Sequence, residues 1–280
     1  MAYLPPAEFV QKAISAGEAK IFMSTKDTVI RAYMAGAILA LAAAFAVTVT
    51  QTTGQPLVGA MLFPVGFSML YLLGYDLFTG VCVLTPLALI DKRPGVTFGG
   101  MMRNWVLVFV GNFAGALTTA VMMAIVFTFG FATEPSPVGK LIAGIGEART
   151  LGYAKYGAAG MLTLFVRAVM CNWMVSTGVI GAMISTSVPG KVIAMWMPIM
   201  VFFFMTFEHS VVNMFLFPSA IMMGGKFSIA DYFIWNEIPT LVGNIVGGIA
   251  FTGLMLYATH AQKDEVRGAG PMVASAAPAE

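Results

Sequence analysis

An acid and an imidazole stand next to each other in the strongly apolar segment "FEHSVVNMFLFP", which begins at Phe207. Glu208 is the only formally charged residue between Lys191 and Lys226, and His209 follows it directly. Histidine titrates near physiological pH, so it can accept or release a proton there. Ionisable residues inside a membrane are expensive to bury and usually serve a function. If this segment crosses a membrane, His209 is therefore a candidate for moving a proton.

The composition of the 280-residue chain indicates that the surroundings are a lipid bilayer. Hydrophobic residues make up 59% of the chain and charged residues only 10%, whereas soluble domains carry about 25% charged residues. The net charge of +2 is too small to suggest a nucleic-acid partner. Long segments that are almost free of charge predict transmembrane helices, and we place six of them at 31–51, 57–90, 104–130, 160–186, 191–223 and 236–260.

The second and fifth predicted helices are too long for one straight crossing of about 20 residues. Each carries an acid near its middle, Asp76 in one and Glu208 in the other, and we expect both helices to be broken there. Three regions follow from this reading: an amphipathic N-terminal helix within 1–30, a transmembrane domain over 31–260, and a disordered tail over 261–280. The first apolar run begins too late for a signal peptide.

The distribution of Lys and Arg predicts that both termini lie in the cytoplasm. With six spans the termini share a side, and this side holds ten basic residues while the other holds four. The side with more Lys and Arg is normally cytoplasmic, so we expect a multi-pass protein of the plasma (inner) membrane. The basic residues on the other side are Lys140, Arg149, Lys155 and Lys226.

The two halves of the chain resemble each other at a fixed offset. "YDLFTGVCVLTP" (75–86) aligns with "FEHSVVNMFLFP" (207–218), and "GNFAGA" (111–116) aligns with "GNIVGG" (243–248), both at an offset of 132. "RAYM" (31–34) and "RAVM" (167–170) match at an offset of 136. We interpret the chain as two repeats, over about 31–130 and 160–260. With three spans each, the repeats have opposite orientations in the membrane.

The repeat predicts roles for the paired residues. The glycines of each "GNxxG" motif are expected to let helices approach closely. Asn112 and Asn244 are expected to form hydrogen bonds between helices or to the broken backbone. Asp76 and Glu208 are expected to point away from the path and to accept hydrogen bonds from free backbone N–H groups of the broken helices. Arg167 either reaches a membrane face or pairs with a carboxylate.

Four motifs together resemble the formate/nitrite transporter family: "DLFTG" (76–80), "CNWMV" (171–175), "FEHSVVNM" (207–214) and "GNIVGG" (243–248). The similarity extends from about residue 5 to residue 257. It implies an aquaporin-like, all-α fold of six helices with the second and fifth broken. It also implies a homopentamer with one pore per subunit that passes small monovalent anions such as formate and nitrite, or hydrosulfide and lactate in some relatives.

The resemblance also assigns site residues. It matches His209 to a central pore histidine, and Thr79 to the threonine of the loop that breaks the second helix. Further matches are hydrophobic constrictions on either side of the centre at Phe63 and Phe202, with Leu77 adding to one of them. Polar positions near the centre are Asn172 and Asn213, alongside Asp76 and Glu208. Two positions depart from the family pattern. Phe67 stands where formate channels commonly have an aliphatic residue, and Lys155 lies one residue further from Asn172 than the family's vestibule lysine does.

The sequence favours a formate channel with proton coupling through His209. A bare anion in an apolar constriction loses its hydration, whereas the neutral acid does not, so proton transfer from the imidazole would help passage. Nitrite and other small anions stay open as substrates. A neutral-solute channel of aquaporin type ranks lower because paired Asn-Pro-Ala motifs are missing. An enzyme is not expected: there is no cofactor motif, and the two His and two Cys, including the packing residues Cys82 and Cys171, cannot form a tetrahedral metal site alone.

Overall fold

A computed structural model of the chain describes residues 3–261, and within this range the fold is built from helices without a strand. Four helices are long and apolar enough to cross a membrane. They are α2 (Thr25–Thr53), α6 (Phe98–Phe127), α9 (Gly157–Ile184) and a composite helix over 229–260, which consists of α12 (Ile229–Tyr232), η1 (Phe233–Glu237), α13 (Ile238–Gly248), η2 (Ile249–Gly253) and α14 (Leu254–His260). The tail from residue 262 onwards lies outside the described residues.

Shorter apolar helices occupy the other two segments that the sequence predicts to lie in the membrane. The first comprises α3 (Pro56–Leu62), α4 (Pro64–Leu72) and α5 (Phe78–Ile90), and the second comprises α10 (Val188–Phe204) and α11 (Ser210–Met222). The breaks predicted near the two acids are therefore present, at residues 73–77 and 205–209. A left-handed residue helps to turn the chain at each break: Gly74 has φ +73° and Thr206 has φ +53°.

Most helices begin a few residues before their predicted starts, because hydroxyl caps decide where they begin. A Ser or Thr side chain accepts a hydrogen bond from a backbone N–H of the first turn, as is usual for an N-cap. The apolar windows of the sequence mark the part inside the bilayer and miss these polar first turns. The caps are Ser24, Thr97, Ser187 and Ser228.

The N-terminal segment forms α1 (Pro6–Phe22). Apolar residues on one side of this helix are buried (Phe9, Val10, Ala13, Ile14 and Ile21). The helix packs against α5, and a Cβ added at Gly17 would overlap the Leu84 carbonyl oxygen. The second half has a corresponding leading segment, α7 (Pro137–Ala148) and α8 (Leu151–Ala154). The similarity of the two halves thus includes helices before residues 31 and 160, where we had placed the repeat starts.

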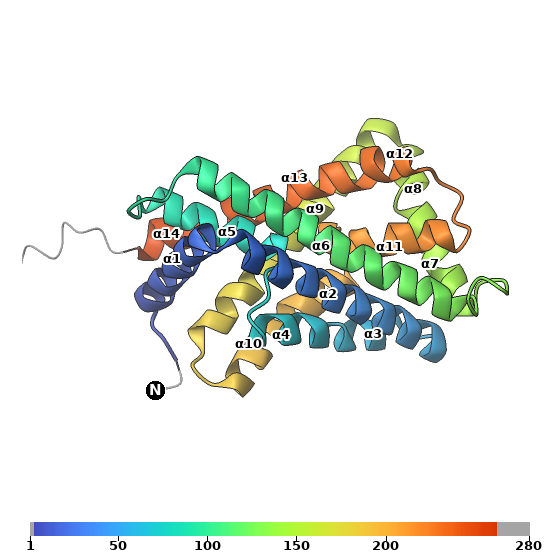
Figure 1. The fold of residues 1–280 in the computed structure, drawn as a ribbon, viewed down its shortest axis with the longest axis horizontal. Coiled ribbons are helices and arrows are strands. Elements are labelled where there is room, and N and C mark those ends of the chain that lie inside the picture. Colours follow the sequence, from blue (N-terminus) through green and yellow to red (C-terminus); the bar gives the residue numbers. More distant parts are fainter. Residues whose placement is uncertain (1–2, 262–280) are drawn as a thin grey trace, which may run out of the picture.

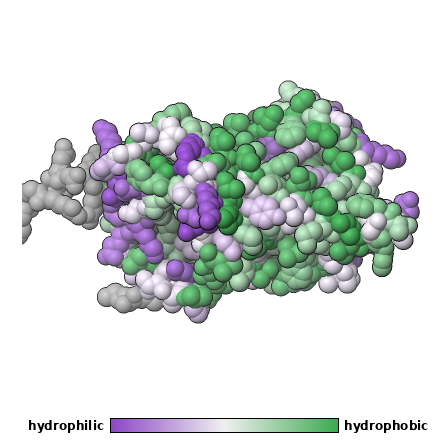
Figure 2. All heavy atoms as spheres, in the orientation of Figure 1, coloured by the Kyte–Doolittle hydropathy of each residue, from purple (hydrophilic) through white to green (hydrophobic). Residues whose placement is uncertain are grey.

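The arrangement of the helices agrees with a protein that crosses a bilayer. α1 and α14 lie at one end of the molecule, and α7 and α8 lie towards the other (Figure 1). Hydrophilic residues gather at these two ends, most densely around the first, while hydrophobic residues dominate the surface between them (Figure 2). The long axis of the molecule is therefore the direction in which it would cross the membrane.

Close contacts between long helices depend on the predicted small residues. A Cβ added at Gly115 would overlap the backbone of Tyr33 on α2, and one added at Gly247 would overlap the backbone of Val169 on α9. The expected role of the "GNxxG" glycines in close packing is confirmed. This packing also places Asn112 and Asn244, the asparagines of the two motifs, next to the helix break in their own half of the chain.

Candidate functional site

The two helix breaks bring Thr79 and His209 together in the interior. Thr79 Oγ1 lies 3.1 Å from His209 Nε2, although the residues are 130 positions apart. Thr79 is in the first turn of α5, and His209 is the residue that caps the start of α11. Both side chains are buried, with exposed fractions of 0% and 1%. The two residues that the resemblance assigned to the pore and to the loop of the second helix are thus in hydrogen-bonding contact.

The second ring nitrogen of His209 is also engaged. Nδ1 accepts a hydrogen bond from the backbone N–H of Val212, at 3.2 Å. A neutral imidazole has one donor and one acceptor nitrogen, so the proton of the neutral ring lies on Nε2 and points to Thr79 Oγ1. The oxygen of the Thr79 hydroxyl accepts this hydrogen bond, and the hydroxyl keeps its own hydrogen free to donate to another group. A doubly protonated ring would require the bond to Val212 to open.

Aromatic rings close the space beside His209. Phe202 stacks on the imidazole with ring centroids 5.4 Å apart. Phe63 contacts Phe202 edge-on at 5.6 Å and stacks on Phe203 at 4.0 Å. Phe63 and Phe202 therefore form one apolar cluster next to the imidazole, so the expectation that they lie on either side of the centre is wrong. Phe203, which the sequence did not single out, belongs to the same cluster. Phe67 and Leu77 are buried as well, with exposed fractions of 2% and 4%.

Asparagines hold both breaks in the same way. The Nδ2 of Asn112 donates to the carbonyl oxygens of Ala32 and Asp76, and its Oδ1 accepts from the N–H of Phe78, the first residue of α5. The second half repeats this pattern: Asn244 bonds to the carbonyls of Ala168 and Glu208 and to the N–H of Ser210. The expectation for Asn112 and Asn244 is confirmed.

The prediction that Asp76 and Glu208 accept hydrogen bonds from free backbone N–H groups at the breaks was wrong, since asparagines take that place. Asp76 forms an ion pair with Lys20, the last basic residue of α1. Its second carboxylate oxygen is buried without a hydrogen bond partner. Lys20 thus links the N-terminal helix to the loop that leads into Thr79.

Glu208 is the centre of a larger network. Its Oε1 accepts a hydrogen bond from the Tyr153 hydroxyl at 2.7 Å. Its Oε2 accepts hydrogen bonds from the side-chain amides of Asn213 at 3.0 Å and Asn236 at 3.2 Å. Arg149 completes the shell, with its guanidinium 3.6 Å from Oε2. Each half thus pairs its acid with a basic residue from its leading helical segment. Tyr153 and Asn236 were missed from the sequence, although Asn236 matches Asn104 at the offset of 132.

The polar position Asn172 connects the helices beside the centre. Its Nδ2 donates to the carbonyl of Asn244 at 2.7 Å and to the thiol of Cys82 at 3.2 Å. Cys82 and Cys171 are buried and free, as expected of packing residues. Within residues 3–261, no group of three His, Cys, Asp or Glu side chains is placed to hold a metal ion.

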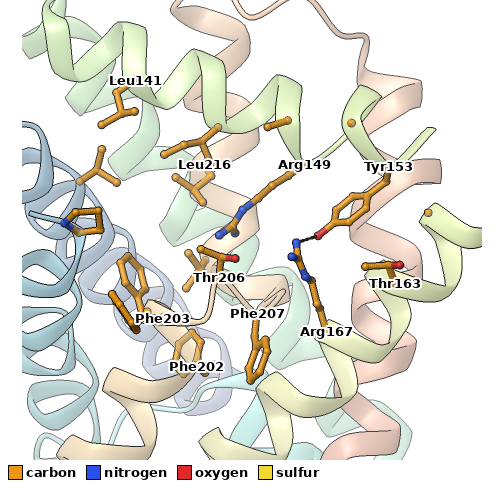
Figure 3. Close-up of a pocket in the computed structure, with 18 of the residues that line it drawn as sticks. Leu141, Arg149, Tyr153, Thr163, Arg167, Phe202, Phe203, Thr206, Phe207 and Leu216 are labelled. Carbon is orange, nitrogen blue, oxygen red and sulfur yellow. Dashed lines mark hydrogen bonds between the residues drawn. The ribbon is translucent and has the colours of Figure 1, made fainter. Parts of the chain in front are cut away.

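A cavity of about 710 Å³ reaches from one end of the molecule to the aromatic cluster. Figure 3 shows Arg149 and Arg167 directed towards its interior, with Phe202 and Phe207 on another part of the wall. Lys155, the expected vestibule residue, is exposed and is not among the lining residues. Arg167 pairs with no carboxylate among the described residues; its guanidinium donates to the Tyr153 hydroxyl at 2.9 Å.

Comparisons with known proteins agree with this architecture. The family model described as "Formate/nitrite transporter" matches residues 7–258. A probable formate transporter from Methanothermobacter thermautotrophicus is 34% identical, with 91% of this chain and 96% of the relative covered. The formate channel FocA of Escherichia coli (strain K12) is 26% identical, with coverage of 94% and 96%.

Two solved structures have a similar fold. One described as an FNT family ion channel has a TM-score of 0.78 and 22% identity, and covers 90% of this chain and 99% of its own. One described as a pentameric formate channel with formate bound has a TM-score of 0.68 and 23% identity, with coverage of 84% and 96%. These matches define a membrane transport protein, not an enzyme. The chain belongs to the formate/nitrite transporter family.

Proposed function

We propose that this protein conducts small monovalent anions across the membrane, with formate as its principal substrate. The observation that carries the proposal is the buried contact of Thr79 with His209 at 3.1 Å, formed where the breaks of two membrane segments meet. Irregular backbone at membrane depth is tolerated where it is buried in protein or lines a path. The formate-related names of the relatives support the choice of formate. Nitrite, hydrosulfide and lactate are alternatives on the same site.

The proposed path begins in the cavity and leads to the centre of the molecule, where Thr79 and His209 lie beside the aromatic cluster. The rings of Phe63 and Phe202, with Leu77 and Phe67 as further narrow points, form the apolar constriction that a hydrated ion does not fit. Thr79 can donate its free hydroxyl hydrogen to the anion, because its oxygen already accepts from His209. Asn172 and Asn213 act as polar support behind this centre, together with the two acids.

Proton coupling is the finer part of the proposal. A formate that takes up a proton at Thr79 and His209 crosses the apolar constriction as neutral formic acid, which avoids most of the desolvation penalty of the ion. In the resting ring, Nδ1 of His209 accepts a hydrogen bond from the Val212 N–H and therefore carries no proton. The donor state therefore forms when a proton replaces the Val212 N–H at Nδ1, and Nε2 then releases its own proton through the Thr79 hydroxyl.

The proposed assembly follows from the resemblance to the formate/nitrite transporter family. Each protomer has six spans as a 3+3 inverted repeat, and five protomers form the channel, each with its own path. The matched asparagine contacts of the two halves and the common 132-residue offset of α5 and α11 support the repeat. We place both termini on the cytoplasmic side of the plasma membrane, because the side of the protein that would hold them carries more Lys and Arg.

Flux measurements in liposomes test the function. Purified protein is reconstituted, and uptake of formate, nitrite and glycerol is measured with and without an imposed pH gradient. We expect formate uptake that rises when the outer solution is more acidic, weaker nitrite uptake, and no glycerol uptake above that of empty liposomes. Glycerol passage without formate passage would show a neutral-solute channel instead.

A further inference from the structure

The cavity in Figure 3 contains a positive charge that pairs with no carboxylate in the described part of the chain. Two arginines line it, Arg149 and Arg167. Arg149 lies 3.6 Å from the carboxylate of Glu208 and is paired with it. Arg167 forms no ion pair within residues 3–261, and its one side-chain hydrogen bond there is to the Tyr153 hydroxyl, a neutral group.

Tyr153 fixes the position of this free guanidinium. Its hydroxyl donates to Glu208 at 2.7 Å and therefore offers a lone pair to Arg167, which donates at 2.9 Å. The Arg167 guanidinium also lies 5.9 Å from the centre of the tyrosine ring, within the range of a cation–π contact. An arginine has five N–H donors in a planar fork. Most of those on Arg167 remain free to bind a ligand.

The rest of the wall determines which ligand fits. A guanidinium fork matches the two oxygens of a carboxylate and binds them in a bidentate manner. Thr206, at the break before Glu208, also lines the cavity and adds a hydroxyl to its wall (Figure 3). Apolar side chains cover the wall elsewhere, among them Leu141, Ile145 and Leu216. A volume of about 710 Å³ is large for an anion of three heavy atoms, so longer chains can be accommodated.

We propose that Arg167, held by Tyr153, binds the head group of monocarboxylate anions in this cavity before they reach the aromatic cluster. The inference rests on the proposed function, because it assigns the first binding step of the same path. Formate binds and moves on past Phe202. A carboxylate with a longer alkyl chain binds in the same place, with its chain on the apolar wall, but is too wide to pass and inhibits formate uptake.

Butyrate is a suitable probe, and its binding can be measured without transport. Calorimetry with the purified parent protein in detergent is compared with Arg167→Gln and Arg167→Lys. Lys140→Gln is the matched control, because it removes the same charge from an exposed side chain outside the cavity lining. Formate uptake and its inhibition by butyrate are then measured for the same four proteins in liposomes.

We expect Arg167→Gln to weaken butyrate binding about tenfold or more, since a hydrogen-bonded charged partner is lost, and to raise the half-saturating formate concentration in parallel. Arg167→Lys should weaken binding by a smaller factor, and Lys140→Gln should match the parent. The site is refuted if butyrate binds the Arg167 variants as well as it binds the parent, or if Lys140→Gln has an equal effect. If Arg167→Gln does not fold, the comparison of butyrate binding by Arg167→Lys and by the control variant tests the site. A parent that binds butyrate but moves no formate would leave this site standing and refute the transport proposal.

Discussion

At the scale of single residues, the buried carboxylate of Glu208 is stabilised by donors from three separate parts of the chain. Tyr153 and Arg149 come from the segment around α8, Asn213 from α11, and Asn236 from the composite last helix. A buried charge requires such partners because its desolvation is costly. The network is fully buried at Glu208, which directly precedes His209, so it also fixes the backbone of the central histidine.

Replacing the acid by its amide should therefore damage the fold. Glu208→Gln places an NH₂ group among side chains that already donate, and it leaves Arg149 without its counter-charge. Removing one partner of a buried ion pair costs about 3 kcal/mol or more, and we expect a lower yield of folded protein and a lower melting temperature. Thermal unfolding in detergent, followed by size-exclusion chromatography, measures both.

The same change at a surface pair provides the control. Glu18 lies 3.9 Å from Arg93, and both side chains are partly exposed. Exposed pairs contribute roughly 0–1 kcal/mol, so Glu18→Gln should unfold at nearly the parent temperature. A Glu208→Gln protein that is as stable as Glu18→Gln but passes cations would show that Glu208 faces the path.

The sequence singled out residues where a motif carried the information. The motifs pointed to His209 and to Thr79 separately, and the structure has the two side chains in contact. The motifs could not reveal Tyr153 as a partner of Glu208, because the two lie 55 positions apart and no feature of "LGYAKYG" distinguishes a hydrogen-bonding tyrosine from a packing one. Arg149 was counted only as a loop charge. Its pairing depends on where α7 ends, which a charge count does not contain.

At the scale of helices, the two breaks are held open by one asparagine each. Asn112 and Asn244 satisfy the first N–H of the helix that follows the break and the carbonyl of the acid before it. All six asparagines of the chain are fully buried (Asn104, Asn112, Asn172, Asn213, Asn236 and Asn244). Because lipid offers no hydrogen bonds, backbone groups freed by a break must be satisfied inside the protein.

Loss of either amide should therefore destabilise its break. Asn244→Ala leaves the N–H of Ser210 and the carbonyl of Glu208 without this partner, and unsatisfied buried groups cost about 1–3 kcal/mol each. We expect a loss of about 3 kcal/mol in stability and strongly reduced formate flux. Asn112→Ala should behave alike, because its contacts are the same. Both are measured by thermal unfolding and liposome flux.

Thr118→Ala serves as the comparison for these variants. Thr118 is exposed on α6, and its hydroxyl bonds only to the Ala114 carbonyl of its own helix. It should keep the stability and flux of the parent. Asparagine variants that match Thr118→Ala in both measurements would mean that the breaks hold without their amides.

Helix types and breaks followed from the sequence more readily than helix ends did. Long uncharged segments identified the membrane helices, and an acid within an overlong segment located each break. The starts were missed because they depend on a single hydroxyl, such as that of Ser24 for α2. The correspondence of α1 with α7 and α8 was missed as well, since their sequences differ and the likeness is one of position in the fold.

At the scale of the whole molecule, a single protomer exposes many large apolar side chains on α2, α6 and α9. In a bilayer these surfaces face either lipid or another subunit. We expect five copies to associate, with the anion path inside each protomer. Mass measurement of the protein in lipid nanodiscs should give a stable pentamer, and a stable monomer or trimer would contradict the proposed assembly.

The central claim is that His209 couples the passage of formate to a proton, and His209→Asn tests it most directly. An asparagine at this position is a good N-cap and can accept the Val212 N–H in place of Nδ1, so the folded assembly should persist, but the side chain cannot titrate. Formate uptake and internal pH are measured together in liposomes that contain the parent or the variant. We expect the parent to carry protons with formate, and the variant to lose both the accompanying proton movement and the pH dependence of uptake. A variant with the same pH profile and the same ratio of protons to formate as the parent would contradict this expectation.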